Sequence, residues 1–391
     1  MFKSNNKKAC PEDIRLSSVE ALSRRVIIAM SGGVDSSVAA ALLKRAGFDV
    51  VGVHMKFWSE GKKSGNKCCT PESEKRARQV AKKLSIPFYV FNFEKEFKKR
   101  IVDYFLKTEK QGKTPNPCVI CNKEIKFGLL LEKALKLNAD FIATGHYARS
   151  QLSGAEWKLL KGKDKNKDQS YFLWQLNQKQ LKHILFPVGN YTKTEVRKLA
   201  KKFKLPTANT QESQEVCFIN TEIHPVKSGR AGVPLKAGQF NRVNYFLRKY
   251  LKTKPGDIVD TRGKILGKHQ GLWFYTIGQR KGIGIAAENP YYVLRKDIKK
   301  NELIITQNKK DLLQKELVVK SVNWISGVKP KLPIKVNTKI RYRSPSASAI
   351  VRQSGNKIKV IFKKPQRAIT PGQSVVFYAG GELLGGGIIP N

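Results

Sequence analysis

The segment Ser31 to Ser36 reads SGGVDS, and its glycines and hydroxyl groups are typical of a loop that binds phosphate. Glycines let main-chain N–H groups close around phosphate oxygens, and a helix that begins there adds the positive end of its dipole. The segment lacks the lysine of the Walker sequence GxxxxGK[ST], and it does not fit the dinucleotide pattern GxGxxG. It predicts a nucleotide-phosphate site of another type, against the alternative of a plain glycine turn.

Cysteines form a second candidate site. Cys118 and Cys121 are spaced as CxxC within TPNPCVICNKEIKF, and Cys217 stands far downstream in ESQEVCFI. Two lysines follow Cys121 closely, and neighbouring cations favour the thiolate, which is the nucleophilic form of cysteine. We expect a reactive thiol at Cys121, and a fold that brings Cys217 to the same pocket would supply a second one.

The remaining cysteines and most histidines carry weaker signals. Adjacent Cys68 and Cys69 rarely present both sulfurs to one tetrahedral ion, so packing or a substrate-channel role is favoured over zinc. Cys10 is interpreted as an incidental thiol. His54 has no ligand spacing to another histidine and is expected to be a hydrogen-bonded structural residue.

Strands and helices alternate around the SGGVDS segment. RVIIAM, starting at Arg25, predicts a strand directly before it, and VAAALLKRAG predicts a helix that ends at Gly47. FDVVGVHMKFW, IPFYVFNF and ADFIATGHY predict further strands with helices between them. This alternation predicts an α/β fold with a parallel sheet covered on both faces, in which ligands gather at the carboxyl edge of the strands.

The pattern divides the chain into a leader and three domains. We expect a poorly ordered leader over residues 1–23 and a nucleotide-binding domain over 24–212, in which Thr192 and Glu195 form the capping box of the last helix. A small mixed domain over 213–284 connects it to an antiparallel β-barrel over 285–391, because short alternating segments there are separated by Gly, Pro, Asn and Ser turns.

Charge points to a polyanionic partner. The chain has 391 residues, with 75 Lys and Arg against 30 Asp and Glu, which leaves a formal net charge of +45. Such an excess favours nucleic acid, although lysines dispersed over all domains can also reflect general composition. The sequence has no apolar run near the roughly 18 residues of a membrane span and no signal peptide, so we expect a globular cytosolic protein.

A series of ordered motifs gives the chain from about residue 24 onward a family resemblance. These are AMSGGVDSSVAA, GVHMKFW, TPNPCVICNKEIKF, ATGHYAR, DQSYFL, ESQEVCFI, YTIGQRKGIGI and the late RYRS. SGGVDS resembles the PP-loop of ATP pyrophosphatases, and the whole series resembles the tRNA-specific 2-thiouridylases, the MnmA family. This resemblance implies an enzyme that converts the wobble uridine of lysine, glutamate and glutamine tRNAs to 2-thiouridine, with release of AMP and pyrophosphate.

The resemblance also implies roles for matching residues. Cys217 would receive sulfur as a persulfide, and Cys121 would attack it, leaving a Cys121–Cys217 disulfide. ATP would be held by Ala29, Met30, Ser31, Gly32, Gly33, Val34, Asp35 and Ser36, with Mg²⁺-bound phosphates near Asp35, and by Met55 and Gly145 at the nucleoside. The target base would be bordered by Asn116, Pro117 and Cys118, and tRNA would be contacted by His146, Lys167, Asp168, Gln169, Arg341, Tyr342 and Gln373.

These roles agree with the chemistry. A pyrimidine carbonyl oxygen leaves poorly unless it is first converted to an adenylate. Sulfur held as a persulfide cannot diffuse away, and a second thiol is needed to cleave the sulfur–sulfur bond. The base must leave the anticodon stack to reach the pocket. The resemblance leaves the sulfur source open between a cysteine desulfurase and a relay protein.

One position departs from the family pattern. Some members have aspartate where this chain has Cys118, and a proposed acid–base role of that carboxylate does not transfer to a thiol. Cys118, Cys121 and Cys217 could instead hold an iron–sulfur cluster with one open position, or serve a plain persulfide relay. Two other functions stay open at this point: another adenylating ligase with a PP-loop, and a noncatalytic basic RNA-binding protein.

Overall fold

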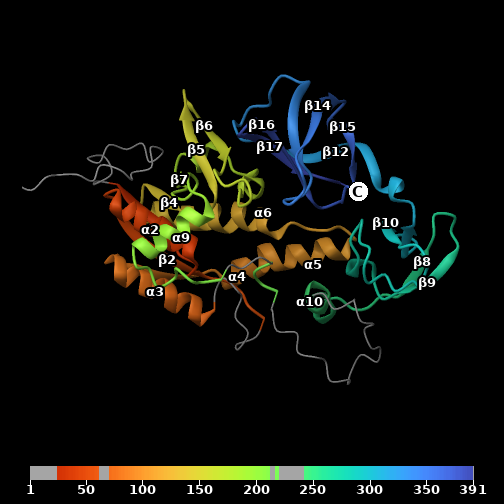
Figure 1. Ribbon diagram of the computed structural model, residues 1–391, viewed down its shortest axis with the longest axis horizontal. Helices are drawn as coiled ribbons and strands as arrows, with labels where there is room; N and C mark the ends of the chain where they lie inside the picture. Colours follow the sequence, from red (N-terminus) through yellow and green to blue (C-terminus); the bar gives the residue numbers. More distant parts are fainter. Residues whose placement is uncertain (1–23, 61–69, 212–215, 220–241, 391) are drawn as a thin grey trace, which may run out of the picture.

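The computed structural model describes residues 24–60, 70–211, 216–219 and 242–390, and within them three β-sheets follow one another along the chain (Figure 1). The expected leader, 1–23, lies outside the described residues. Cys10, Cys68 and Cys69 also lie outside them.

The first sheet is parallel, as the alternating pattern predicts. Its five strands have the order β3-β2-β1-β4-β7. Their bounds are β1 Arg25–Ala29, β2 Asp49–Lys56, β3 Phe88–Asn92, β4 Phe141–Ala143 and β7 Ile184–Leu185. The chain leaves β1 toward β2 on one side and later places β4 on the other side. The carboxyl end of β1 is therefore the point where the strand order reverses, which is where α/β sheets bind ligands.

Helices cover both faces of this sheet (Figure 1). α2 (Val34–Arg45), α3 (Pro71–Leu84) and α9 (Lys193–Lys202) share one core with Val26 and Ile28 of β1. Ile27 of the same strand faces a second core with the helices on the other side. Those helices are α4 Glu94–Phe97, a π-helical turn Lys98–Val102, α5 Asp103–Lys110, α6 Pro117–Cys121, a π-helical stretch Asn122–Leu129 and α7 Leu130–Lys136. The alternation of side chains along a strand accounts for the two cores.

The capping box predicted for α9 is confirmed. The Thr192 side chain accepts from the Glu195 main-chain N–H, and the Glu195 carboxylate accepts from the Thr192 N–H at 2.6 Å. Between β7 and the upstream strands lie a short 3₁₀ turn, Ser170–Leu173, and α8, Gln178–Leu181. A capping box formed by Asn177 and Gln180 likewise begins α8.

A hairpin that the sequence pattern did not reveal joins the first domain to the barrel. β5 (Ala148–Ser153) and β6 (Glu156–Lys161) pair with each other, and β6 continues the barrel sheet by pairing with β17 (Glu382–Ile388). Nearby, the Trp174 indole donates to Ser374 Oγ at 3.0 Å. The first domain and the barrel therefore share a hydrogen-bonded sheet and a buried polar contact.

The central sheet contains four strands in the order β10-β11-β8-β9. Their bounds are β8 Gly256–Val259, β9 Ile265–His269, β10 Tyr292–Asp297 and β11 Glu302–Thr306, and α10, Arg242–Tyr250, precedes them. The expected division after residue 284 would cut this sheet between β9 and β10, although β11 pairs with β8. Because β8 to β11 form one sheet, we propose that the barrel domain begins after β11.

The antiparallel barrel at the carboxyl end is confirmed. Six strands follow one another in the order β12-β15-β14-β13-β16-β17, and pairing of β12 with β17 closes the circle. They are β12 Leu313–Trp324, β13 Ile334–Lys339, β14 Ala347–Ser354, β15 Lys357–Arg367, β16 Ser374–Ala379 and β17 Glu382–Ile388. Val351, Phe362 and Phe377 fill the interior. Closure removes the exposed strand edges that an open sheet would leave.

Candidate active site

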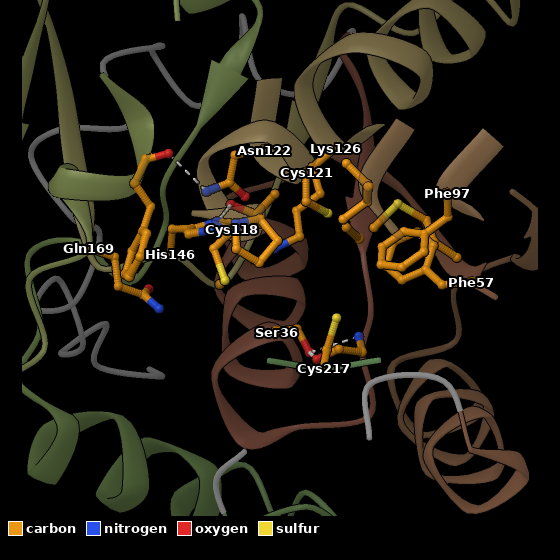
Figure 2. A pocket seen from close by; sticks show the side chains of 18 of the residues that line it. Ser36, Phe57, Phe97, Cys118, Cys121, Asn122, Lys126, His146, Gln169 and Cys217 are labelled. Carbon is orange, nitrogen blue, oxygen red and sulfur yellow. Dashed lines mark hydrogen bonds between the residues drawn. The ribbon is translucent and has the colours of Figure 1, made fainter. Parts of the chain in front are cut away.

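A cavity of about 310 Å³ lies at the carboxyl edge of the parallel sheet, and Figure 2 shows the side chains around it. It brings together three segments that are distant in the sequence: the PP-loop after β1, the CxxC segment at the start of α6, and the segment around Cys217. The predicted residues that line it are Ala29, Met30, Ser31, Asp35, Ser36, Met55, Pro117, Cys118, Cys121, Gly145, His146, Gln169 and Cys217. The expectation that Cys121 and Cys217 share one pocket is therefore met.

The PP-loop is shaped by Gly32 and by the start of α2. Gly32 has a φ of +72°, and a Cβ there would lie 2.1 Å from the main-chain oxygen of Ser73 in α3. Only glycine tolerates both conditions. Arg76 Nε donates to the Gly32 carbonyl at 3.1 Å, which ties α3 to the loop.

The amino end of α2 is available to an anion. Gly33 is the N-cap residue, and no side chain in the described part of the protein caps this end. The Ser36 hydroxyl donates to the Gly33 carbonyl at 3.1 Å, so it fixes the turn itself. Unpaired first-turn N–H groups and the helix dipole attract phosphate oxygens.

Gly145, directly after β4, closes the loop against this helix end. A Cβ at Gly145 would lie 2.7 Å from the Ser36 main-chain nitrogen. The glycine therefore allows the β4 loop to touch the amino end of α2. This is the close approach that a nucleotide site between β1 and β4 requires.

Asp35 is held by two residues that the sequence interpretation missed. Lys193 Nζ lies 2.7 and 2.8 Å from the two carboxylate oxygens, and the Tyr147 hydroxyl donates to Oδ1 at 2.7 Å. Lys193 is the first residue of α9, and only its neighbours Thr192 and Glu195 carried a sequence signal. Among the cavity-lining residues that the structure describes, Asp35 is the only carboxylate.

The CxxC segment opens α6. Asn116 is its N-cap, with Oδ1 accepting from the Val119 N–H at 3.4 Å, and Pro117 is the first helical residue. Cys118 is exposed and Cys121 is 7% exposed. Residues three apart lie on one side of a helix, so both thiols can border the same cavity.

The barrel holds the loop that leads into α6. Gln373 Nε2 donates to the carbonyl oxygens of Thr114 at 3.0 Å and Pro115 at 3.2 Å. The Thr114 N–H donates in turn to the Pro371 carbonyl at 2.9 Å. The barrel thereby fixes the main chain at Thr114 and Pro115, directly before Asn116 and Pro117 at the start of α6.

An aromatic cluster holds the Cys217 segment. Phe218 is 2% exposed, and its ring centroid lies 5.9 Å from that of Phe97, 5.4 Å from Phe105 and 5.5 Å from Phe246. The adjacent Cys217 is half-buried and lines the cavity. Helices α4, α5 and α10 thus determine where the second thiol lies.

Two histidines in the cavity wall are kept neutral by burial. His146 Nδ1 lies 2.7 Å from the Thr144 hydroxyl, and burial, together with the charge of Lys126, holds the His146 pKa well below its usual value. His54 Nδ1 donates to the Met30 carbonyl at 2.8 Å, and burial lowers the His54 pKa. The structural hydrogen bond expected for His54 is confirmed, although the sequence did not reveal that it borders the cavity.

Several expected tRNA contacts also have partners within the protein. Asp168 is buried, and its Oδ1 accepts from the main-chain N–H groups of Gly162 and Ser170 at 3.1 Å. Arg341 donates to the carbonyls of Ile277 and Ala368 and to the Thr370 hydroxyl. The Arg341 contacts join the barrel to the central region, whereas the Asp168 contacts lie within the first domain.

Three further expected tRNA contacts differ in their surroundings. The Tyr342 ring lies 4.4 Å from that of Phe172, which lines the cavity. Gln169 lines the cavity too, and its Oε1 accepts from the Tyr147 N–H at 2.9 Å. Lys167 lies outside the cavity on the adjoining turn.

The cysteines do not form a metal-ligand group in this structure. Within residues 24–60, 70–211, 216–219 and 242–390, no three His, Cys, Asp or Glu side chains are placed to hold a metal ion. Cys118, Cys121 and Cys217 therefore share a cavity without the arrangement that an iron–sulfur cluster needs. In the same ranges, no helix has the length and apolar character needed to cross a membrane.

Comparison with family models divides the chain into three matches. Residues 24–221 match the model described as tRNA methyl transferase HUP domain. Residues 244–307 match the tRNA methyl transferase PRC-barrel domain, and residues 314–389 match the aminomethyltransferase beta-barrel domain. The first match alone covers about half of the chain.

Curated relatives extend over nearly the whole chain. A protein of Thermoanaerobacter sp. (strain X514) named tRNA-specific 2-thiouridylase MnmA 2 is 45% identical over 377 residues, covering 94% of this chain and 98% of the relative. Relatives named tRNA-specific 2-thiouridylase MnmA are 45% identical in Alkaliphilus oremlandii, covering 93% and 96%, and 43% identical in Geobacillus thermodenitrificans, covering 93% and 94%.

Proposed function

The chain belongs to the tRNA-specific 2-thiouridylase family, and from this premise we propose that it replaces the 2-oxygen of the wobble uridine of tRNA with sulfur. The single observation that carries the proposal is the meeting of the PP-loop, Cys121 and Cys217 at one cavity. The products are 2-thiouridine, AMP and pyrophosphate. The enzyme is a tRNA-uridine 2-sulfurtransferase.

The first step makes the uracil 2-oxygen able to leave. Transfer of the adenylyl group of ATP to this oxygen releases pyrophosphate and creates a bond that later breaks with departure of AMP. The amino end of α2 and the PP-loop would hold the phosphates, while Met55 and Gly145 would contact the nucleoside. Asp35, whose carboxylate is oriented by Lys193 and Tyr147, would offer an oxygen to Mg²⁺, an ion that binds through few carboxylates together with phosphates and water and would neutralise phosphate charge.

The second step delivers sulfur. Cys217 carries a terminal sulfur as a persulfide, and the Cys121 thiolate attacks Cys217 Sγ. The sulfur–sulfur bond of the persulfide breaks, its terminal sulfur bonds to carbon 2 of the activated base, and AMP leaves. The enzyme is left with a Cys121–Cys217 disulfide, so each further turnover needs two electrons from a dithiol reductant in solution.

Cys118 borders the target base in this proposal together with Asn116 and Pro117. It carries no acid–base role, because a thiol at this position replaces the carboxylate of some relatives. We assign no step to an iron–sulfur cluster, because the described cysteines do not form a group of metal ligands. Sulfur therefore passes from the Cys217 persulfide directly to the activated base.

The partners follow from this chemistry. The tRNA substrates are those for lysine, glutamate and glutamine, and the formal net charge of +45 favours their binding. The residues proposed to contact tRNA are His146, Lys167, Asp168, Gln169, Arg341, Tyr342 and Gln373. A cysteine desulfurase or a relay protein supplies the persulfide, and the cytoplasm is the compartment where these components meet.

Thiolation of purified tRNA tests the proposal. The protein is incubated with tRNA, ATP, Mg²⁺, a dithiol, cysteine and a cysteine desulfurase, and nucleosides are quantified by mass spectrometry. We expect 2-thiouridine only when ATP is present, with AMP and pyrophosphate formed in equal amounts. Tight tRNA binding without these products would instead favour a noncatalytic RNA-binding protein.

Cysteine variants separate thiolation from other adenylating reactions. Cys121→Ser and Cys217→Ser should each abolish 2-thiouridine formation, because either change removes a sulfur that the second step uses. Cys10→Ser is the matched control for loss of a thiol outside the family match, and it should retain activity. Full activity in both site variants would reject the mechanism.

A further inference from the structure

Asn122, the residue after Cys121, presents a buried acceptor that nothing in the described structure satisfies. The side chain is 3% exposed and lines the cavity. Its Nδ2 donates to the Phe172 carbonyl at 3.1 Å, whereas Oδ1 has no hydrogen-bond partner among the described residues. Buried polar atoms normally have partners, because an unsatisfied one costs free energy.

The hydrogen bond to Phe172 fixes the orientation of the amide. A main-chain carbonyl oxygen can only accept, so the group facing it must be the amide nitrogen. In Figure 2, the dashed line of this hydrogen bond leaves the amide nitrogen of Asn122, and the amide oxygen lies on the other side of the group. The amide oxygen of this cavity-lining residue is therefore an acceptor of fixed orientation that lacks a donor among the described residues.

An aromatic ring lines the same cavity as Asn122. Phe172 lines the same cavity, and its ring lies 4.4 Å from that of Tyr342, which restricts its movement. Single-stranded RNA bases are recognised by stacking on aromatic rings combined with hydrogen bonds to the base edge. Asn122 and Phe172, which line one cavity, bring an acceptor and an aromatic ring to it.

We propose that Asn122 selects uracil by accepting a hydrogen bond from N3–H of the flipped target base. Uracil carries a donor at N3, whereas cytosine carries an acceptor there. The Asn122 oxygen would therefore attract the first base and repel the second. This role rests on the proposed function, since it assigns a specificity residue to the same cavity.

Modified anticodon stem-loops provide the test. RNAs with uridine, 3-methyluridine or cytidine at the wobble position are compared by equilibrium binding to the full-length protein, without ATP. The methyl group replaces the N3 hydrogen, so the wild-type protein should bind 3-methyluridine and cytidine RNAs roughly 10- to 100-fold more weakly than uridine RNA.

Asn122→Ala removes the acceptor and the donor together. The variant should bind uridine RNA more weakly, and the difference between uridine and 3-methyluridine RNAs should fall to about 2-fold or less. Asn323→Ala is the matched control, because Asn323 Nδ2 also donates to main-chain carbonyls, those of Trp174 and Leu176, outside the cavity. The control should keep the wild-type preference. Asn122→Leu, which is similar in size and also has no acceptor, replaces Asn122→Ala if the latter does not fold.

The outcomes distinguish the inference from the proposed function. A wild-type protein that forms no 2-thiouridine on uridine RNA contradicts the proposed function. Thiolation with an unchanged preference in Asn122→Ala contradicts the inference alone. A selective loss of ATP affinity in Asn122→Ala, with base preference intact, would overturn it too, because the donor would then be the adenine amino group.

Discussion

Phe218 is predicted to determine where the persulfide cysteine lies, although its side chain performs no chemistry. Its ring is 2% exposed and makes three aromatic contacts, with centroid distances of 5.4 to 5.9 Å. Phe218→Ala removes all of them. The change should release the Cys217 segment from the cavity wall and leave the parallel sheet folded.

The structure allows the size of this effect to be bounded. Truncation of a buried phenylalanine costs about 3–5 kcal/mol, of which each ring contact contributes about 0.5–1.5 kcal/mol. A factor of ten in population corresponds to about 1.4 kcal/mol. If the whole cost falls on the segment, the ratio of molecules with Cys217 in place to those with it displaced drops by about 10²- to 4 × 10³-fold, and we expect the thiolation rate to drop by at least about 10-fold.

Two assays measure the displacement directly. Single-turnover thiolation, started with persulfide-loaded protein, reports the delivery step, and alkylation by iodoacetamide reports exposure of the Cys217 thiol. Phe218→Ala should slow thiolation and speed alkylation, whereas ATP affinity should change little. Phe218→Leu, which keeps an apolar side chain, should lie between the two proteins.

Phe362→Ala is the matched control. Phe362 is 1% exposed in the barrel core, so its loss should lower stability without altering Cys217 alkylation. The reasoning is refuted if Phe218→Ala leaves both alkylation and single-turnover thiolation at wild-type rates. It is also refuted if Phe362→Ala speeds alkylation equally, because the effect would then reflect general destabilisation.

Three further predictions concern groups with unusual surroundings. His146 is buried with a pKa well below 6.5, so below this pH the unfolded chain binds a proton that the folded chain does not. The free energy of unfolding should therefore fall as the pH drops below about 6.5. In chemical denaturation at a series of pH values, this fall should be shallower for His146→Gln, and an unchanged slope would contradict the prediction. Glu109 of α5 and Lys296 of β10 are buried together, and burial raises the Glu109 pKa and lowers the Lys296 pKa, each to about 8. In chemical denaturation at neutral pH, the effect of Lys296→Met on the free energy of unfolding should differ by about 0.5–3 kcal/mol between the wild-type and Glu109→Gln backgrounds; additive effects would show that the two groups do not interact. Arg341→Ala should weaken tRNA binding and flatten its salt dependence while ATP affinity stays constant. The same variant should lower the melting temperature, because Arg341 also bonds main-chain carbonyls, and equal loss of tRNA and ATP affinity would argue against its tRNA contact.

The parts of the fold that local pattern controls were predictable. RVIIAM followed by SGGVDS gave a buried strand and a glycine loop, and the strand order places that loop at the reversal point of the sheet. The capping box at Thr192 was readable because its two partners lie three residues apart. The family motifs then placed Cys121 and Cys217 in one pocket, which the cavity confirms.

Contacts between distant residues were not predictable. The β5–β6 hairpin is short, and its pairing with β17 depends on residues more than half the chain away. Lys193 carries no motif, and only the fold brings its ammonium group to Asp35. β10 and β11 resemble barrel strands in sequence but pair with the central sheet, because register and partner choice follow from tertiary packing.

Sulfur tracing tests the central claim most directly. Protein carrying a ³⁴S-labelled persulfide on Cys217 is mixed with tRNA and ATP under single-turnover conditions, and both RNA and protein are analysed by mass spectrometry. We predict ³⁴S in 2-thiouridine and one Cys121–Cys217 disulfide for each sulfur transferred, both dependent on ATP. Labelled 2-thiouridine formed by Cys121→Ser protein at the wild-type rate, or without a disulfide in the wild type, would contradict the account.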